Sequence, residues 1–390
     1  METEYEKQDR ENHIKLKNKW AQPRVVIWTG PAWEPWNKQK VDEGMAGSET
    51  WASYLAREFV KKGFRTVIYN DLLSENKSDV VLDPVYSEDG KKIGDVIYRD
   101  HTNMQKDVEY DVVDYFIASR STEPLKMNVH SLVSDVMVHD IWLSADKNYD
   151  TMTWRVRKYA YLSEWHRNFL SKHHGLISDQ MFKTANGIDW DLYRDVDRLN
   201  KKRQMVWSSS PDRGLYEFLI MFPKIRKQVP DFELLITYGF YNWEKAAAIR
   251  NNVNELNYIK AIKELMAQDG VKYVGRVSKR VLAELQKESM VWLYSTAFTE
   301  TFGITAVENG AAYNAILCTK LAGLIDTVGN GGILIDGINS TKEYQEEFVA
   351  QAIKLLTDDK FRIEWAEKAN DKMREYSWGN IVDKWIKEWE

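Results

Sequence analysis

Three segments near the start of the chain decide the fold: "RVVIWTG" (Arg24–Gly30), "GSETWASYLAREFVKKG" (Gly47–Gly63) and "RTVIYN" (Arg65–Asn70). The first and third are short runs rich in β-branched residues, which predicts strands. Between them, apolar side chains recur at every fourth position, which predicts a helix. A strand, a loop containing glycine, a helix and a second strand are the beginning of a doubly wound α/β unit.

The ends of the predicted helix follow from its own residues. Its apolar face repeats at Trp51, Leu55 and Phe59. Serine is a residue type whose side-chain oxygen caps a helix start, and glycine is a residue type that ends one. We therefore expect Ser48 to cap the helix and Gly63 to end it. Further strand-like runs follow at "DVIYR", "YDVVDYFIAS", "SDVMVHD" and "YAYLS".

The same pattern restarts near Met205. Strand-like and helical segments occur there in the order "MVWSSS", "RGLYEFLIMFPKIRKQV", "FELLITYG", "VKYVGRV", "SKRVLAELQKE", "VWLYS", "AILCTK" and "GGILID". A chain of 390 residues is also longer than a single core usually grows. We expect two Rossmann-like domains with a cleft between them, and ligands beyond the carboxyl ends of the strands.

This pattern divides the chain into four expected parts. Residues 1–22 form a charged lead-in, and residues 23–185 form an N-terminal Rossmann-like domain. Residues 186–370 form a C-terminal domain. Residues 371–390 form an amphipathic helix with three Trp, which we expect to brace the two domains.

The composition argues against several classes of protein. Lys and Arg number 54 against 59 Asp and Glu, giving a net charge of −5, and no basic block is long enough to track a phosphate backbone. The single cysteine, Cys318, lies in a strand-like run and reads as a buried apolar residue. The start of the chain lacks the apolar core of a signal peptide, and no run of about 18 apolar residues occurs. We expect a soluble, cytoplasmic protein that is at most peripheral at a membrane.

The stretch "FTETFGITAVE" (Phe298–Glu308) sets two carboxylates eight residues apart around Gly303. A helix that begins near Gly303 would point its N–H groups and positive dipole end at a ligand, which favours an anion such as a diphosphate. Carboxylates repel such an anion but accept hydrogen bonds from hydroxyls. Glu300 and Glu308 therefore suit a nucleotide-sugar, with one carboxylate for the sugar and the other for the ribose. The alternative is that both are solvated charges at a helix end.

Several segments, in order along the chain, resemble the GT-B retaining glycosyltransferases, most closely family GT4. They are "GMAGSETWASYLAREFVKKG", "YLSEWHRNFL", "KTANGIDWDLY", "SSSPDRGLYEFLIMFPKIRKQVPDFELLITYG", "VKYVGRVSKRVLAELQKESMVWLYST" and the E-x7-E element in "FTETFGITAVENG". Together they cover most of the chain from about Val25 onward. The resemblance implies the GT-B fold, an α/β architecture of two Rossmann-like doubly wound domains facing across a cleft. It also implies hexosyl or pentosyl transfer with retention of configuration and without a metal.

The resemblance further implies that the N-terminal domain, residues 23–185, is the acceptor side and that the C-terminal domain, residues 186–370, holds the nucleotide-sugar donor. Glu300 would contact the transferred sugar and Glu308 the ribose hydroxyls. Arg213 falls where the family usually has a lysine that clamps the diphosphate, and arginine also suits phosphate. The other implied donor-binding positions are the backbone of Phe302, Gly303 and Ile304 beside the phosphates, and Arg276, Val277 and Lys279 around the "GRVS" turn beside the base.

One position departs from the family pattern. The family often has an arginine about five residues before the lysine that Arg213 replaces, and this chain has "WSSS" there. Either Ser208 or Ser209 would donate a hydrogen bond instead, or Arg276 or Lys279 would supply the charge. The departure favours one alternative function, a catalytically idle protein that binds nucleotide-sugars or glycans.

Two features of the N-terminal domain complete the expected site. Gly47 would let the backbone approach the phosphates at the start of the Ser48 helix, unless it is only a capping residue. "VMVHDIW" places His139 and Asp140 at the end of an apolar run and so at the mouth of the cleft. The family has a histidine here, and we interpret His139 as a catalytic residue that polarises the sugar or orients the acceptor, with a structural role as the alternative. No metal-ligand spacing occurs among the other six His, and no metal site is expected.

The expected function is transfer of a sugar from a UDP- or GDP-sugar to a hydroxyl of a glycan or lipid-linked acceptor. The nucleotide-sugar is a co-substrate, and no cofactor is expected. Two alternatives remain beside the binding protein. One is a glycosyltransferase acting on a modified nucleic-acid base, which the acidic charge balance disfavours. The other is a glycoside hydrolase with Glu300 and Glu308 as acid and nucleophile, which requires the two carboxyls to lie about 5 to 9.5 Å apart.

Overall fold

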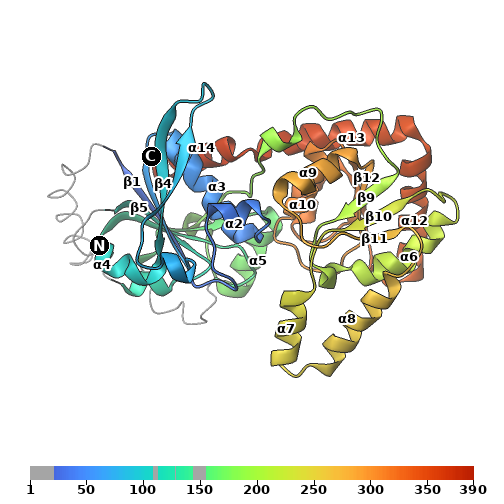
Figure 1. Cartoon of the computed structure of the whole chain (residues 1–390), viewed down its shortest axis with the longest axis horizontal. Coiled ribbons are helices and arrows are strands. Elements are labelled where there is room, and N and C mark those ends of the chain that lie inside the picture. The colour runs from blue at the N-terminus through green and yellow to red at the C-terminus, as the bar shows by residue number, and fades with distance from the viewer. Residues whose placement is uncertain (1–21, 109–112, 128, 144–154) are drawn as a thin grey trace. The chain divides into compact units, whose positions relative to one another are not determined.

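The computed structural model describes residues 22–108, 113–127, 129–143 and 155–390. Residues 1–21 of the expected lead-in lie outside the described residues. The chain divides into two compact units (Figure 1). Unit 1 comprises Met1–Asn186 together with Trp378–Glu390, and unit 2 comprises Gly187–Ser377. The two units are described separately below.

Unit 1 is built on an eight-stranded sheet in the order β3-β4-β2-β1-β5-β6-β7-β8. All neighbouring pairs are parallel except β3 with β4. Val26 of β1 faces Val67 on one side and Phe116 on the other, which confirms the doubly wound beginning of the chain. The strands are β1 Arg24–Gly30, β2 Arg65–Asn70, β3 Val81–Tyr86, β4 Lys92–Asp100, β5 Val113–Ser119, β6 Ser131–Met137, β7 Lys158–Tyr161 and β8 Met181–Lys183.

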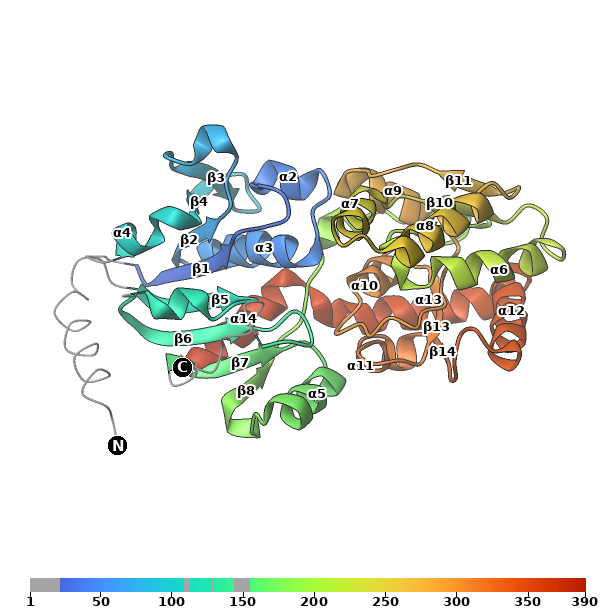
Figure 2. The same cartoon turned by 90° about the horizontal axis from the view of Figure 1, so that it is seen from below.

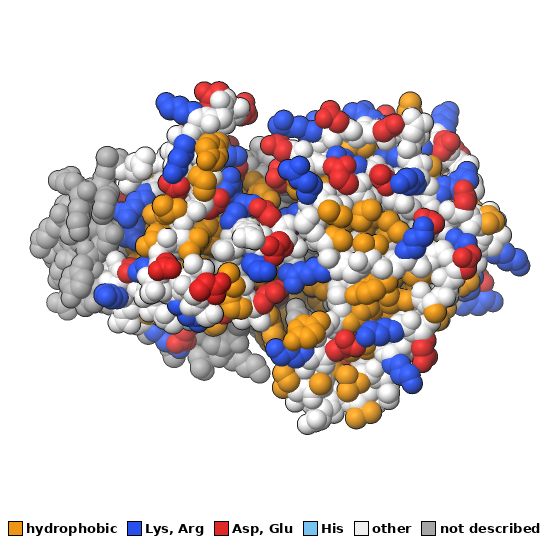
Figure 3. All heavy atoms as spheres, viewed as in Figure 1, with side chains coloured by type: hydrophobic (Ala, Val, Ile, Leu, Met, Phe, Trp, Pro, Cys, Tyr) orange, Lys and Arg blue, Asp and Glu red, His pale blue; other side chains and the backbone are white. Residues whose placement is uncertain are grey.

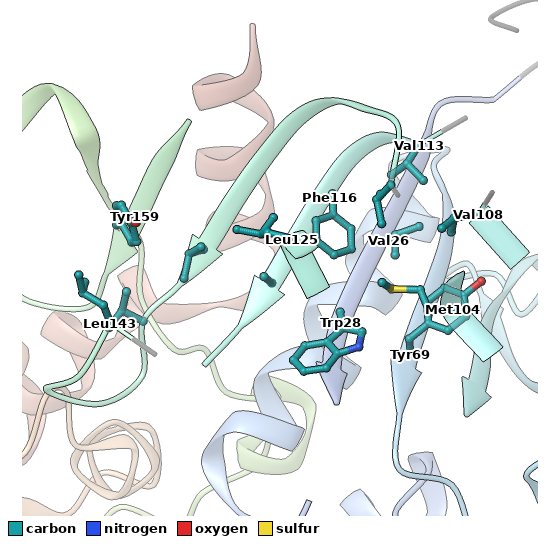
Figure 4. Close-up of a cluster of buried hydrophobic side chains, with 14 of the residues drawn as sticks. Val26, Trp28, Tyr69, Met104, Val108, Val113, Phe116, Leu125, Leu143 and Tyr159 are labelled. Atoms are coloured by element: carbon teal, nitrogen blue, oxygen red, sulfur yellow. The ribbon is translucent and has the colours of Figure 1, made fainter. Parts of the chain in front are cut away.

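One face of this sheet carries a continuous hydrophobic cluster, drawn in Figure 4. Every second residue of the central strands points into it, such as Val26 and Trp28 of β1 and Phe116 of β5. Helix α4 (Met104–Val108) covers part of it with Met104 and Val108, both fully buried. Each large apolar side chain buried in this way contributes roughly 1.5–3 kcal/mol to stability.

The opposite face is covered by α3 (Gly47–Lys61) and α14 (Trp378–Trp389). The predicted apolar repeat of α3 is confirmed, because Trp51, Leu55 and Phe59 are all fully buried. Trp385 of α14 lies 5.9 Å from Trp51 between ring centroids, and Trp389 stacks on Phe59 at 5.1 Å. The C-terminal amphipathic helix is therefore part of the core of unit 1.

The start of α3 differs from the prediction. The helix begins at Gly47, and Ala46 occupies the N-cap position without a side-chain hydrogen bond. Ser48 is already the second helical residue, so its hydroxyl is not at the capping position and instead donates to Glu49 at 2.9 Å. The end is as predicted, because Gly63 directly follows the C-cap Lys62 and adopts a φ of +89°.

Among the described residues, unit 1 also contains the α-helices α2 (Lys38–Asp42) and α5 (Glu164–His174). At the edge of the sheet, β3 and β4 form a hairpin that exposes about half of Leu82 and of Tyr86. In Figure 3, hydrophobic side chains gather below a projecting tip that carries charged side chains. Pro84 lies in the edge strand, a position where proline blocks pairing with further strands.

Unit 2 contains two three-stranded parallel sheets, β11-β10-β9 and β12-β13-β14. They meet at a bridge between Lys202 and Ser289, where the Met290 N–H donates to Gln204 O at 3.2 Å. The strands thus follow one another as β11-β10-β9-β12-β13-β14, the strand order of a dinucleotide-binding fold. Their bounds are β9 Gln204–Trp207, β10 Glu233–Ile236, β11 Val271–Tyr273, β12 Val291–Tyr294, β13 Ala315–Thr319 and β14 Ile333–Ile335.

Helices cover both faces of this second sheet. In Figure 1, α9 and α10 lie on one side and α6 and α12 on the other, and Figure 2 shows α13 along β13. Cys318 of β13 is fully buried as predicted. None of the described helices combines the length and the apolar composition that crossing a bilayer requires. The helices are α6 Leu215–Arg226, α7 Tyr241–Ile249, α8 Val253–Leu265, α9 Lys279–Glu288, α10 Ile304–Ala311, α11 Leu324–Val328, α12 Lys342–Thr357 and α13 Asp359–Met373.

Candidate functional site

The strand order of unit 2 reverses between β9 and β12, and ligands of such sheets bind at this point. The turn after β9 carries Arg213, and the turn after β12 carries Glu300. Gly214 allows these two turns to touch. Its φ is +103°, and a Cβ atom there would lie 2.1 Å from the carbonyl oxygen of Ser295. Only glycine is compatible with both conditions.

The two site residues that the sequence predicted on these turns are brought into direct contact. Arg213 Nη1 donates to both carboxylate oxygens of Glu300, at 3.0 and 3.2 Å. Tyr294, the last residue of β12, donates its hydroxyl to the same carboxylate at 2.8 Å. The Arg213 guanidinium also lies over the ring of Phe298, 4.2 Å from its centroid. Glu300 is only 8% exposed, so its carboxylate is held in a defined orientation.

The protonation states of this cluster follow from burial and charge. Burial, and then the neighbouring Glu300 carboxylate, raises the pKa of Tyr294 well above its usual value, so its hydroxyl remains a donor. Burial opposes the charge of Arg213, but Glu300, Tyr294 and Asp212 together outweigh burial and raise the pKa of the guanidinium. The cluster therefore presents a fixed cation and a fixed carboxylate side by side.

Helix α10 begins directly after this cluster. Gly303 is its N-cap with a φ of +94°, and no side chain caps the helix. A Cβ atom at Gly303 would lie 2.7 Å from Leu324 Cδ2. Phe302 is buried with its ring against Tyr376, 5.1 Å between centroids, and Ile304 is the first helical residue. The N–H groups of the first turn thus point toward the turn that carries Glu300.

Glu308 belongs to a second group, further along α10. Its Oε2 accepts a hydrogen bond from Gln286 of α9 at 3.4 Å. Burial raises the pKa of Glu308, while the nearby Lys279 ammonium and Gln286 hold the rise back. Lys279 is the first residue of α9, so the structure brings two predicted donor-binding residues of opposite charge near each other.

The remaining predicted donor residues lie around these groups. Ser209 is buried, and its hydroxyl lies 3.4 Å from that of Thr305 in the first turn of α10. Arg276 and Val277 precede α9, with Arg276 exposed and Val277 half-buried. Ser208 stands where the family often has an arginine. Ser208 Oγ is buried without a hydrogen-bond partner among the described residues, and so is Arg213 Nε.

In unit 1, His139 follows the carboxyl end of β6. Its Nε2 lies 3.1 Å from the hydroxyl of Ser119 at the end of β5, and its ring packs edge-on against Trp51, 5.1 Å between centroids. Burial first, and then Arg120 and His166, lower the pKa of His139 well below its usual value. His139 is therefore a neutral imidazole at pH 7, able to act as a hydrogen-bond partner or proton acceptor.

Arg120 links the predicted residues of unit 1 to one another. Its guanidinium pairs with Asp140 at 2.9 Å and donates to the Ser48 hydroxyl at 3.4 Å. Gly47 and Ser48 form the first turn of α3, so this turn, Arg120 and the loop after β6 are neighbours. In the parts of the chain that the structure describes, no group of three or more His, Cys, Asp or Glu is arranged to hold a metal ion.

Sequence reasoning missed three contributors to these sites: Arg120, Tyr294 and His166. Arg120 and Tyr294 stand at the carboxyl ends of parallel strands, a position that could have drawn attention to them. Arg120 also adopts a φ of +66°, a left-handed conformation that is uncommon for a residue other than glycine and that no sequence pattern announces. His166 reaches the loop after β6 from a distant helix, and its sequence context gives no signal for this.

The chain is similar to known proteins both in sequence and in structure. Residues 201–372 match the family model described as "Glycosyl transferases group 1". A D-inositol 3-phosphate glycosyltransferase of Corynebacterium urealyticum is 30% identical over 133 residues, which are 32% of this chain and 29% of that protein. The chain thus matches less than a third of the length of this relative.

Solved structures resemble the chain over almost its whole length. A glycosyltransferase from Rickettsia africae has a TM-score of 0.67 at 15% identity, covering 95% of this chain and 98% of that one. Anabaena Alr3699/HepE, solved in complex with UDP and glucose, has a TM-score of 0.63 at 12% identity, covering 94% and 99%. At these identities the likeness concerns the fold, which is the expected GT-B architecture.

Proposed function

We propose that the protein transfers a sugar from a nucleotide-sugar to a hydroxyl acceptor, because residues 201–372 match the family model described as "Glycosyl transferases group 1". The observation that carries the proposal is the cluster of Arg213, Glu300 and Tyr294 at the point where the strand order of unit 2 reverses. A cation beside a carboxylate matches a donor that offers a diphosphate next to sugar hydroxyls.

Two buried polar atoms support the same site. Arg213 Nε and Ser208 Oγ have no hydrogen-bond partner among the described residues. Leaving a buried donor unpaired costs about 1–3 kcal/mol, so such groups call for a ligand that satisfies them. Phosphate oxygens are strong acceptors for both donors. Ser208 would then contribute a hydrogen bond where the family often has a positive charge.

We propose the following roles on binding of the donor. Arg213 exchanges Glu300 for the diphosphate, and Glu300 then accepts hydrogen bonds from the sugar hydroxyls while Tyr294 keeps it in place. The N–H groups at the start of α10, with Gly303 as its N-cap, favour the phosphates by their dipole. Glu308 accepts hydrogen bonds from the ribose hydroxyls.

The proposed reaction retains the anomeric configuration and is independent of metal. As the bond between sugar and diphosphate breaks, negative charge develops on the leaving diphosphate. Arg213 and the first turn of α10 stabilise that charge, and Lys279 contributes at longer range. We propose His139 as the residue of unit 1 that orients the acceptor hydroxyl, and a glycan or lipid-linked glycan as the acceptor.

A UDP-sugar is the first donor to test, because the Anabaena structure contains UDP and glucose. A second candidate function is donor binding without turnover. One observation favours it: Arg213 and Glu300 form an ion pair with each other, so neither is free to act on the diphosphate or the sugar while the pair persists. Donor turnover separates the two functions.

The experiment is a thermal-shift panel of UDP-, GDP-, ADP- and CDP-sugars with EDTA present, followed by product analysis with the nucleotide that binds. A ligand at about 100 times its Kd stabilises the folded state by about 2.7 kcal/mol. We expect one nucleotide class to stabilise the wild type, and to stabilise Glu308→Ala much less. Glu284→Ala, which removes an exposed carboxylate from α9, is the control and should respond like the wild type. A panel without any shift would overturn the donor site, and a shift without turnover would establish the binding protein.

A further inference from the structure

The loop after β6, residues 138–143, is held by its main chain. The Val138 N–H donates to Ala160 O at 3.0 Å. Beyond His139, His166 Nε2 lies 2.9 Å from the carbonyl oxygen of Asp140, and His174 Nε2 lies 2.9 Å from that of Ile141. The two carbonyl groups that follow His139 are thus each bonded to a histidine of α5.

Helix α5 places both histidines so that they can hold the loop after β6. His166, Leu170 and His174 are four residues apart and therefore lie on one face, and Leu170 between the histidines is fully buried. Ser163 caps the helix by accepting a hydrogen bond from the His166 N–H at 3.1 Å. At the other end, Gly175 terminates it in the left-handed conformation. Both histidines are therefore presented from a helix with defined ends.

The hydrogen bonds of His166 specify its tautomer. The Leu162 N–H donates to Nδ1 at 3.3 Å, so Nδ1 is an acceptor and Nε2 carries the proton donated to Asp140 O. Burial lowers the pKa of His166 to about 4, opposed by Asp140 and assisted by His174. His166 in turn contributes to lowering the pKa of His139. A second proton on Nδ1 would face the Leu162 N–H and break this arrangement.

We propose that His166, assisted by His174, is a positioning residue for the transfer reaction, which sets the orientation of His139 by holding the carbonyl groups that follow it. The proposal rests on the function proposed above, in which His139 orients the acceptor. His166 itself touches neither substrate, because its two ring nitrogens are both engaged with main-chain groups.

The first test is a double-mutant cycle on the full chain. His166→Leu removes both hydrogen bonds and should lower kcat about 10- to 100-fold, since a small misplacement of a reacting group has effects of this size. The KM for the donor should change less than about 2-fold, because the proposed donor residues lie in unit 2. His166→Gln, whose amide can donate to Asp140 O, should restore most of the activity. His173→Leu, on the exposed side of the same helix, is the matched control and should be unaffected.

The decisive comparison is made in a His139→Ala background. There, His166→Leu should cause no further loss of kcat, because the residue it positions is gone. An equal loss of kcat in both backgrounds would overturn the proposal. So would a His166→Gln variant that melts at the same temperature as the wild type but does not recover kcat.

A second readout does not require turnover. NMR titration of the His139 imidazole should give a pKa below the ordinary range in the wild type and in His173→Leu. His166→Leu and His166→Gln both remove the direct influence of His166 on this pKa, but only His166→Gln can still hold Asp140 O, so the His139 pKa should rise further in His166→Leu than in His166→Gln as the loop moves. If the wild type transfers no sugar, the proposed function fails while this measurement still tests the positioning. A His139 titration that is the same in His166→Leu as in His166→Gln would overturn it.

Discussion

The two units hold their candidate residues in different ways. In unit 2, Glu300 is fixed through its own side chain, by Arg213 and Tyr294. In unit 1, the loop that carries His139 is fixed through main-chain carbonyls, by His166 and His174. Side-chain contacts restrict which residue types work at a position, whereas a carbonyl accepts from any suitably placed donor. Substitutions should therefore be less tolerated around Glu300 than around His139.

The largest effect is expected where the two turns of unit 2 touch. Gly214→Ala places a Cβ in left-handed backbone, against the Ser295 carbonyl. We expect a loss of roughly 4 kcal/mol from the free energy of unfolding in urea, from backbone strain plus overpacking. Gly239→Ala is the control, because a Cβ there meets no heavy atom within 4 Å. Equal losses for the two variants would show that the turns do not depend on this close approach.

The next effect concerns unit 1 and pH. His166 has a folded-state pKa of about 4, below the value of about 6.5 expected in the unfolded chain. The stability it contributes is present above pH 6.5 and is lost as the pH falls toward 4. The loss amounts to about 3 kcal/mol. Between pH 7 and pH 4, the free energy of unfolding of the wild type should fall by about 3 kcal/mol more than that of His166→Gln. Parallel pH profiles for the two proteins would refute a buried neutral histidine.

Arg213→Met tests the cation of unit 2. Hydrogen bonds to charged groups contribute about 1.5–3 kcal/mol, so the affinity for the stabilising nucleotide should fall about 30-fold in calorimetric titration. The Glu300 carboxylate, no longer paired, adds repulsion of the diphosphate. Arg280→Met on the exposed side of α9 serves as the control. If both variants bind alike, Arg213 does not contact the phosphates.

The smallest effect is expected from Tyr294→Phe, which removes one hydroxyl and keeps the ring. Glu300 loses one of its donors but retains Arg213. A single hydrogen bond is worth about 1 kcal/mol, so kcat should fall about 5-fold with little change in nucleotide affinity. Tyr238→Phe, on the surface of the same unit, should leave kcat unchanged. If kcat of Tyr294→Phe falls further than kcat of Arg213→Met, the order of importance of these two residues is reversed.

The sequence predicted what depends on local pattern. The strand, helix and strand from Arg24 to Asn70 are where periodicity and glycine placed them, because neighbouring residues decide these elements. Ser48 was wrongly assigned as a cap, because the observed N-cap is Ala46, two residues earlier, and helix boundaries are uncertain by one or two residues. The burial of Cys318 was predicted correctly from its apolar surroundings.

What the sequence did not predict depends on contacts between distant segments. Arg213 and Glu300 are 87 positions apart and were assigned to different parts of the same donor, yet they bond to each other. The contact of His166 with Asp140 joins a helix to a loop through a carbonyl, a group that every residue carries. No residue-type pattern can announce such a bond. The left-handed Arg120 is likewise set by its surroundings.

The placement of α14 has a consequence for biosynthesis. Unit 1 is interrupted in sequence by the whole of unit 2, because Trp378–Glu390 follows Ser377 in the chain. During translation, unit 2 is therefore complete before α14 leaves the ribosome. Until then Trp51 and Phe59 of α3 lack the aromatic partners that cover them, Trp385 and Trp389. The nascent protein thus carries an uncovered aromatic surface for the time needed to synthesise unit 2, a surface that chaperones are suited to protect.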